Sequence, residues 1–192
     1  MTGTDVIRER AVELYGEGVL RRSALGIRGG AGAFEWALAG KGIRRVLEIG
    51  TYKGVSAAAI SQYVEHVTTI DLVRGRLEHT DPSFDREEFW RSMGIGNITQ
   101  ILIGNDAEKK AIVDALDFDF AFVDGAHDAT VRNDFELVKR CGLVLFHDAA
   151  DNRKRGFNEN ASNHVYEFVS TLPPEQLQFN DIFCLWTAPG LN

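Results

Sequence analysis

Short runs of apolar residues recur along the middle of the chain, and longer segments with helical spacing separate them. The first run, residues 46–49, ends at Gly50, and the residues that follow predict a helix over 54–65. The same alternation predicts strands at 66–71, 98–103, 117–124 and 142–147, helices at 85–93 and 129–140, and a further helix that opens at 104–107. Strands that alternate with helices indicate an α/β protein built on a parallel sheet.

The two ends of the chain depart from this alternation. Apolar residues among charges predict an amphipathic helix over 5–15, glycines and arginines predict a loop or lid over 16–32, and 33–39 suits a short helix. At the other end we expect a helix over 162–171 and then two short strands in 177–187. These patterns predict one domain over 1–192, divided into N-terminal helices and lid (1–40), a ligand-binding core (41–150) and a C-terminal helix and hairpin (151–192).

The first predicted strand, its turn and its helix form a unit that suits a ligand. Gly50 allows a tight turn, and Gly54 lets other groups approach the backbone. The free N–H groups at the start of the helix suit a carboxylate or a phosphate. Dinucleotide enzymes carry G-x-G-x-x-G at this point, whereas Tyr52 stands here where a middle glycine would make room for a pyrophosphate.

Acidic residues occur at or just beyond the end of each predicted strand. Asp71 lies 21 residues after Gly50, the spacing of the acid that receives ribose hydroxyl groups, since a carboxylate accepts two hydrogen bonds from a cis-diol. Because parallel strands end at the same edge of a sheet, we expect these acids to converge on one rim. They are Glu48, Asp71, Asp106, Asp124 and Asp148.

Composition narrows the class of ligand. The 192 residues are 44% hydrophobic, which argues against disorder, and they carry a formal net charge of −7. Without a basic footprint, an apolar run of membrane length or a signal-peptide core, we expect a cytoplasmic protein that takes a small-molecule substrate and binds no nucleic acid and no membrane. The two cysteines, Cys141 and Cys184, are expected to be buried thiols, and the sequence is compatible with a homo-oligomer without specifying one.

Three segments resemble a known family. The string L-E-I-G-T-Y-K-G-V-S over 47–56 resembles motif I of the class I S-adenosylmethionine (SAM)-dependent methyltransferases, and it is closest to the catechol O-methyltransferase-like branch. The segments F-V-D-G-A-H (122–127) and L-F-H-D (145–148) resemble the members whose fourth and fifth strands end in DG-x-H and HD. The resemblance implies a Rossmann-like, doubly wound, seven-stranded and mostly parallel sheet with an antiparallel C-terminal hairpin.

The resemblance also implies roles for individual residues. The SAM-binding positions would be Glu48, Gly50, Tyr52, Gly54, Ser56, Asp71, Asn105, Asp106 and Asp124. In the catechol-type relatives, acids after strands four and five hold Mg²⁺ or a similar ion, and Asp124 and Asp148 match them, although Ala149 replaces the helping asparagine. The relatives also carry a lysine that acts as a base three residues after the first acid, and His127 stands at that position here. His127 and Asp124 are therefore the candidate catalytic residues.

For some of the polar residues near the strand ends the sequence also allows a purely structural role. Asp106 suits a helix N-cap, and His127 could cap the helix that starts near Asp128. Strand alternation puts His147 on the face opposite Asp148, which favours a hydrogen-bonded structural histidine over a metal ligand. Asp134 suits a cap or a pairing with an arginine such as Arg132 or with a loop group.

The pattern as a whole predicts a SAM-dependent small-molecule methyltransferase that acts on a hydroxyl group, with or without a divalent metal. An NAD(P)-dependent oxidoreductase is the main alternative, and Tyr52 and the terminal hairpin argue against it. A non-catalytic SAM-binding protein is a second alternative, because Ala149 and His127 depart from the family pattern. The sequence does not identify the methyl acceptor.

Overall fold

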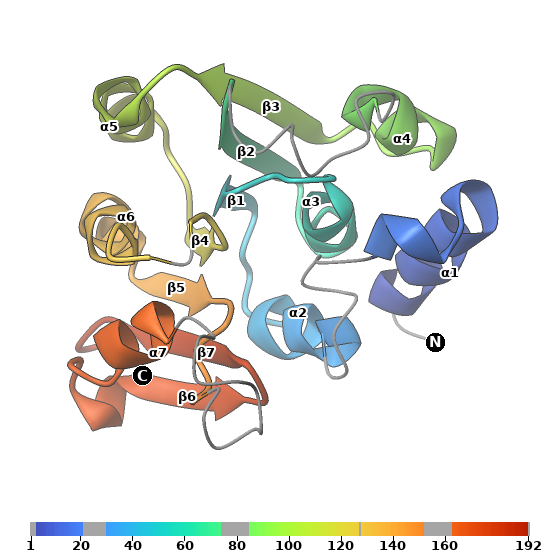
Figure 1. Cartoon of the computed structure of the whole chain (residues 1–192). Helices are drawn as coiled ribbons and strands as arrows, with labels where there is room; N and C mark the ends of the chain where they lie inside the picture. Colours follow the sequence, from blue (N-terminus) through green and yellow to red (C-terminus); the bar gives the residue numbers. More distant parts are fainter. Residues whose placement is uncertain (1–2, 21–29, 74–84, 127, 152–162, 192) are drawn as a thin grey trace.

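One seven-stranded sheet organises the computed structural model, which describes residues 3–20, 30–73, 85–126, 128–151 and 163–191. The strand order is β3-β2-β1-β4-β5-β7-β6 (Figure 1). Neighbours from β3 to β5 pair in parallel, whereas β7 runs antiparallel to both β5 and β6. The predicted mostly parallel sheet with an antiparallel C-terminal hairpin is therefore confirmed. The strands are β1 (Arg45–Ile49), β2 (His66–Leu72), β3 (Ile98–Ile103), β4 (Phe120–Val123), β5 (Leu143–Phe146), β6 (Leu177–Asn180) and β7 (Phe183–Thr187).

Helices cover both faces of the sheet, as a doubly wound fold requires. Figure 1 shows α1 to α4 on one side of the sheet and α5 to α7 on the other. The first layer holds α1 (Gly3–Tyr15), α2 (Gly30–Leu38), α3 (Val55–Ile60) and α4 (Arg86–Ser92), and the second holds α5 (Asp106–Ala115), α6 (Val131–Val138) and α7 (His164–Val169). Short 3₁₀ turns follow some of the helices along the chain: η1 (Glu17–Leu20) after α1, η3 (Lys139–Cys141) after α6 and η4 (Pro174–Gln176) after α7.

Each face of the sheet has its own hydrophobic core. Because side chains alternate along a strand, β4 sends Phe120 and Phe122 into the core under α1 to α4, and Ala121 and Val123 into the other. In the first core the ring of Phe122 meets that of Phe34 edge-on, with centroids 5.1 Å apart. Strands buried on both faces explain why the apolar runs in the sequence are nearly continuous.

Several elements are shorter than the sequence predicts. The helix expected over 54–65 ends at Ile60, where the Ser61 hydroxyl bonds back to the Ala58 carbonyl and the chain turns. Asn97 fixes that turn by donating to the carbonyls of Ser61 and Val64. Residues 139–141 continue α6 only as the 3₁₀ turn η3, which ends at Gly142 with a φ of 82°. The predicted lid over 16–32 is described only in part, and 21–29 lies outside the described residues.

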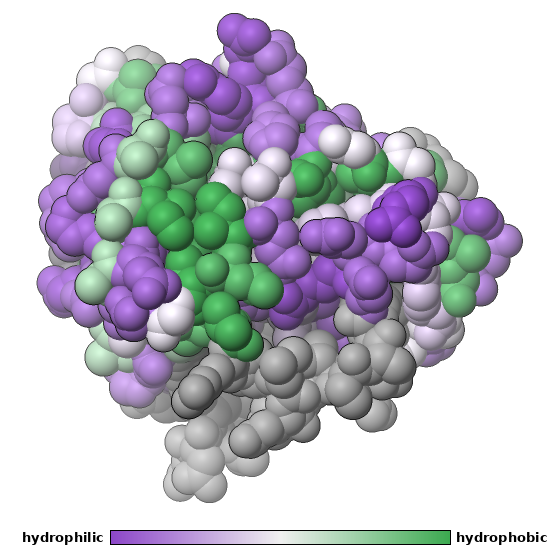
Figure 2. Space-filling view, turned by 90° about the horizontal axis from the view of Figure 1, so that it is seen from above, coloured by the Kyte–Doolittle hydropathy of each residue, from purple (hydrophilic) through white to green (hydrophobic). Residues whose placement is uncertain are grey.

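Large hydrophobic side chains are exposed where β2 and β3 end. Leu72, Val73 and Leu102 are 45%, 50% and 51% exposed. Figure 2, which views the molecule from the side of β3, shows a hydrophobic area on this part of the surface. In the described part of the chain, no helix is both long enough and apolar enough to cross a membrane.

Candidate functional site

The glycine turn after β1 lies directly against the end of β4. Gly50 has a φ of 98°, and a Cβ built on it would lie 2.2 Å from the carbonyl oxygen of Asp124. The Gly50 N–H donates to the Ile70 carbonyl at 2.9 Å, which ties the same turn to β2. Only a residue without a side chain can occupy this place, and the three strand ends meet there.

Glu48 lies below this turn and is completely buried. Its Oε2 accepts a hydrogen bond from the Thr69 hydroxyl at 2.5 Å, whereas its Oε1 has no hydrogen-bond partner within the described residues. Burial raises the pKa of Glu48 to about 8, the nearby hydroxyls of Ser56 and Thr69 lower it, and the charges of Asp124 and Asp71 raise it further. A buried acid with an unsatisfied oxygen is costly to the fold, and it is suited to receive a cation.

Asp71, at the end of β2, holds the next part of the turn. Its Oδ2 accepts from the backbone N–H of Tyr52 at 3.0 Å, and its Oδ1 accepts from that of Leu72 at 2.9 Å. Arg86 of α4 completes the arrangement with an ion pair of 3.3 Å to Oδ2. Burial raises the pKa of the Asp71 carboxyl, and the Arg86 charge opposes that shift.

Asp124 and Asp148 lie on either side of the imidazole of His147. The His147 Nδ1 is 2.7 Å from Asp124 Oδ1, and its Nε2 is 3.7 Å from Asp148 Oδ1. The prediction that His147 faces away from Asp148 is wrong, because Asp148 adopts a φ of 55° and so interrupts the strand alternation. The imidazole is buried, as expected for a hydrogen-bonded structural histidine, but it contacts both candidate metal-binding acids.

The donor set at this point is made of carboxylate oxygens. The Asp124 and Asp148 side chains are 14% and 27% exposed, so both remain in reach of water or a ligand. The described residues hold no group of three or more His, Cys, Asp or Glu side chains that could bind a metal ion. Two carboxylates with water fit Mg²⁺, which keeps much of its hydration shell, better than they fit Zn²⁺.

The residue that caps the N-terminus of α5 is not the one suggested by the sequence. Asn105, and not Asp106, is the N-cap, since its side chain accepts from the Glu108 N–H. The Asp106 side chain is 71% exposed and forms an ion pair of 2.9 Å with Lys109. Lys109 also pairs with the buried Asp134 at 2.6 Å, so the prediction of an arginine partner for Asp134 is wrong.

The described structure therefore brings five predicted residues together: Glu48, Gly50, Tyr52, Asp71 and Asp124. Ser56 lies close enough to Glu48 to lower its pKa. Asn105 and Asp106 lie after β3, which is paired to β2. His127 lies outside the described residues, so its predicted role remains a prediction.

Sequence reasoning missed Arg86 and Trp90, which reach the glycine turn from α4. Trp90 Nε1 donates to the Gly54 carbonyl at 2.8 Å, and a Cβ on Gly54 would lie 2.6 Å from the Trp90 ring. Their spacing of four residues puts both on one helix face, but nothing in the sequence says which part of the sheet that face meets. Sequence reasoning also gave no weight to Leu72 and Val73, an apolar pair directly after Asp71 whose side chains are exposed.

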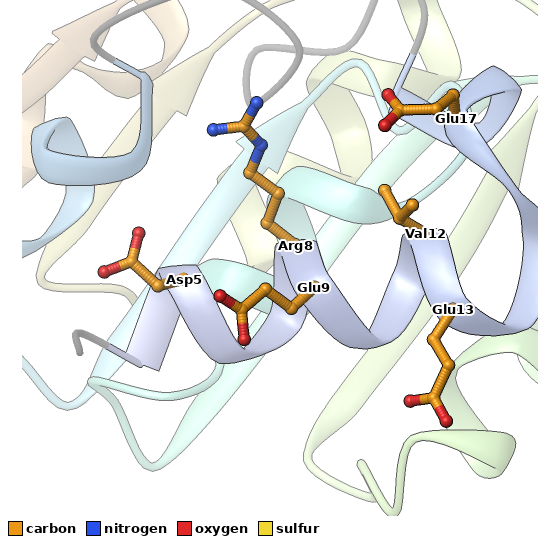
Figure 3. Close-up of a pocket in the computed structure, with 6 residues that line it drawn as sticks. All are labelled: Asp5, Arg8, Glu9, Val12, Glu13 and Glu17. Carbon is orange, nitrogen blue, oxygen red and sulfur yellow. The ribbon is translucent and has the colours of Figure 1, made fainter.

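A separate hollow lies on the N-terminal helix. Its volume is about 470 Å³, and among the described residues its lining comes from α1 and η1: Asp5, Arg8, Glu9, Val12, Glu13 and Glu17 (Figure 3). None of the residues predicted from motif I or from the strand ends lines it. The candidate site is therefore defined by the sheet edge and not by this hollow.

Comparison with known proteins supplies independent information. A family described as a methyltransferase domain matches residues 47–149. Among solved structures, an O-methyltransferase from Bacillus cereus in complex with S-adenosylhomocysteine (SAH) is similar with a TM-score of 0.66 and 15% identity, over 95% of this chain and 90% of that one. No curated protein matches the chain.

Two further solved structures share the fold. Cofactor-bound Rv0187 from MTB has a TM-score of 0.64 and 15% identity, over 98% of both chains. The O-methyltransferase TomG from Streptomyces achromogenes, in complex with SAM, has a TM-score of 0.56 and 15% identity, over 99% of this chain and 91% of that one. At these identities the likeness establishes the shared fold.

Proposed function

Because the chain belongs to the family of methyltransferase domains, we propose that it transfers the methyl group of SAM to a hydroxyl group of a small molecule. Membership in this family argues against the NAD(P)-dependent alternative. The observation that carries the choice of methyl donor is Glu48, a buried acid with an unsatisfied oxygen beside the glycine turn. SAM brings a cationic ammonium group to such a turn, whereas a pyrophosphate would bring negative charge towards the carboxylates of Asp71 and Asp124.

The amino-acid end of SAM is assigned to Glu48, Gly50, Gly54 and Ser56. The Glu48 Oε1 would receive the ammonium group, and the N–H groups at the start of α3 would receive the carboxylate. The ammonium charge would then favour the ionised form of Glu48, in opposition to the effect of burial on its pKa. The site is thus partly built and is completed by the ligand.

The nucleoside end is assigned to the edges of β2 and β3. Asp71 would bond the ribose, and Asn105 or Asp106 would bond the adenine amine. The exposed side chains of Leu72 and Val73 offer an apolar surface for the adenine face, which gives them a role that solvent exposure alone does not explain. The SAH bound to the Bacillus cereus O-methyltransferase and the SAM bound to TomG, two proteins of the same fold, support SAM as the ligand.

The acceptor hydroxyl is assigned to the edge formed by Asp124, His127 and Asp148. His127 would take the hydroxyl proton, and the oxygen would attack the methyl carbon in line with the carbon–sulfur bond. One oxygen–carbon bond forms as that bond breaks, and its electron pair goes to sulfur, which cancels the sulfonium charge. The contribution of the protein is mainly alignment, which can supply about 7–11 kcal/mol.

A divalent metal such as Mg²⁺ is the finer part of the proposal. Asp124 and Asp148 would hold it through carboxylate oxygens, and when bound it would lower the pKa of the acceptor hydroxyl. His147 would help to orient Asp124, to which it is hydrogen-bonded at 2.7 Å, and its Nε2 lies 3.7 Å from Asp148. Titration of the protein with Mg²⁺, followed by calorimetry for wild type and Asp148→Asn, tests this part separately from turnover.

Calorimetry with SAH and NADH is the first test of the proposed function. We expect SAH to bind and NADH not to bind, and the reverse result would overturn the proposal. A panel of hydroxylated acceptors with labelled SAM then tests catalysis. We expect transfer that is reduced by at least about a hundredfold in His127→Ala and in Asp124→Asn. Binding of SAH without transfer to any acceptor in the panel would favour the non-catalytic alternative.

Cellular location and assembly also remain predictions. Cell fractionation tests the expected cytoplasmic location. Size-exclusion chromatography with light scattering tests whether copies of the chain associate.

A further inference from the structure

Helix α4 bonds to the glycine turn at two points. Arg86 Nε donates to the Tyr52 carbonyl, and one helical turn later Trp90 Nε1 donates to the Gly54 carbonyl at 2.8 Å. Tyr52 itself has a φ of 45°, a conformation that needs support from its surroundings. The helix therefore holds the segment that we assign to SAM, although none of its residues belongs to the sequence motifs.

Arg86 also uses one of the hydrogen-bond acceptor positions of Asp71, the acid that we assign to the ribose. Within the described residues the Tyr52 and Arg86 donors reach Oδ2 of the Asp71 carboxylate and the Leu72 donor reaches Oδ1, and the Thr51 backbone also bonds to this carboxylate. A carboxylate offers about four acceptor positions, two on each oxygen. Most of these positions are already used, so the Asp71 carboxylate cannot accept hydrogen bonds from both ribose hydroxyl groups.

The guanidinium group of Arg86 has donors to spare at the same place. Arginine carries five N–H donors, and the described contacts of Arg86 use one at Nε and one at Nη2. The Arg86 and Asp71 side chains are 15% and 17% exposed, so the pair is largely shielded but still open on one side. An acceptor and a donor thus lie next to each other, which matches two neighbouring hydroxyl groups.

We propose that Arg86 is a second ribose-binding residue, which donates a hydrogen bond to one hydroxyl oxygen of the SAM ribose while Asp71 accepts from the other hydroxyl. This inference rests on the proposed function, because it assumes that Asp71 faces the ribose. If the inference holds, the ion pair between Arg86 and Asp71 makes the site specific for a ribose with both hydroxyl groups. A nucleoside that lacks either hydroxyl leaves one member of the pair without its ligand partner.

The test compares Arg86→Ala with Arg91→Ala by calorimetry. Arg91 lies on the same helix, and its 69% exposed side chain pairs only with Glu88 among the described contacts. Each variant is titrated with SAH, with 2′-deoxy-SAH and with 3′-deoxy-SAH. We expect Arg86→Ala to bind SAH about tenfold or more weakly than wild type, and Arg91→Ala to bind it like wild type.

The deoxy ligands separate recognition from a purely structural effect. The tenfold loss caused by Arg86→Ala should shrink to less than about threefold for the analogue that lacks the hydroxyl bonded by Arg86. Arg86→Lys, which keeps the charge but cannot bridge Tyr52 and Asp71 together, should recover only part of the SAH affinity. Thermal unfolding of each variant checks that the fold is retained.

Two results would overturn the inference while leaving the proposed function standing. One is a wild-type protein that binds SAH together with an Arg86→Ala variant that binds it equally well. The other is an Arg86→Ala loss of the same size for SAH and both deoxy analogues. Failure of the wild type to bind SAH would instead reject the proposed function itself.

Discussion

Glu48 is an acidic side chain in a fully buried environment. Its pKa of about 8 lies well above its ordinary value of 4.5. The folded state holds the Glu48 proton more tightly than the unfolded chain does, so protonation of Glu48 stabilises the fold. This contribution to the free energy of unfolding is complete below about pH 4.5 and is lost as the pH rises to about 8. Without ligand, the neutral acid is the form that the fold accepts.

We therefore predict that the free energy of unfolding of wild type falls, relative to Glu48→Gln, between pH 5 and pH 8.5. The total change should be up to about 5 kcal/mol, since each unit of pKa difference corresponds to about 1.4 kcal/mol. Urea unfolding of both proteins across this range measures it. Two curves that stay parallel throughout would show that Glu48 does not change its proton affinity on folding.

The same residue links ligand binding to a proton. If the SAM ammonium group pairs with Glu48, binding at pH 7 should release close to one proton, because the carboxyl group is still largely protonated in the free protein. Calorimetry in buffers of different ionisation enthalpy measures the number of protons released on SAH binding. Glu48→Gln should abolish the release, and a wild-type value near zero would contradict the pairing.

Gly50 and Gly40 offer a matched test of the glycine turn. Both have a positive φ, 98° and 73°, but a Cβ on Gly40 would meet nothing within 4 Å, whereas one on Gly50 would collide with the Asp124 backbone. Gly40→Ala should cost about 1 kcal/mol of stability through backbone strain, and Gly50→Ala about 3–4 kcal/mol. Chemical unfolding measures both values. Equal costs would mean that the turn can move away from β4.

At the scale of elements, a buried ion pair joins α5 to α6. Lys109 and Asp134 are 8% and 2% exposed, and their charged atoms are 2.6 Å apart. The neighbouring Lys110 makes the same type of contact with Asp114, but on the surface, where its side chain is 62% exposed. Burial decides how much each pair matters, because an unpaired charge in the interior has no water to solvate it.

We predict that Lys109→Met lowers the stability by about 3–5 kcal/mol, since it leaves Asp134 buried without its partner. Lys110→Met should change it by less than about 1 kcal/mol. The double variant Lys109→Met with Asp134→Leu should recover most of the loss, because it removes both charges. Urea unfolding of the three variants distinguishes a buried charge effect from a simple loss of packing, which the double variant would not repair.

The sequence predicted which elements exist better than it predicted where they end. Strand β3 has the predicted bounds, because its β-branched residues and the flanking glycine and asparagine fix it locally. The predicted helix over 54–65 is longer than the observed one, because Asn97, which is remote in the sequence, supports the turn that ends the helix. Asn105 and Asp106 are both acceptable caps by composition, and only the backbone path selects Asn105.

At the scale of the whole molecule, one sheet separates two hydrophobic cores and belongs to both. Unfolding of either helical layer would expose the shared strands, so we predict one cooperative thermal transition for the full chain. At a free SAH concentration of 100 times its Kd, that transition should be stabilised by about 2.7 kcal/mol. Scanning calorimetry tests both points. Two separate transitions would contradict the prediction of a single domain over 1–192.

The sequence alone determined the order of strands and helices, the glycine turn and the acids at the strand ends. These features follow from local periodicity, from backbone geometry and from the rule that parallel strands end at one edge. The tertiary structure decided which groups meet across that edge: Arg86 on Asp71, His147 between Asp124 and Asp148, and Lys109 on Asp134. Apart from the neighbours His147 and Asp148, these pairs join residues 15 to 25 positions apart, so their partners depend on how the elements pack together, and no local pattern records that packing.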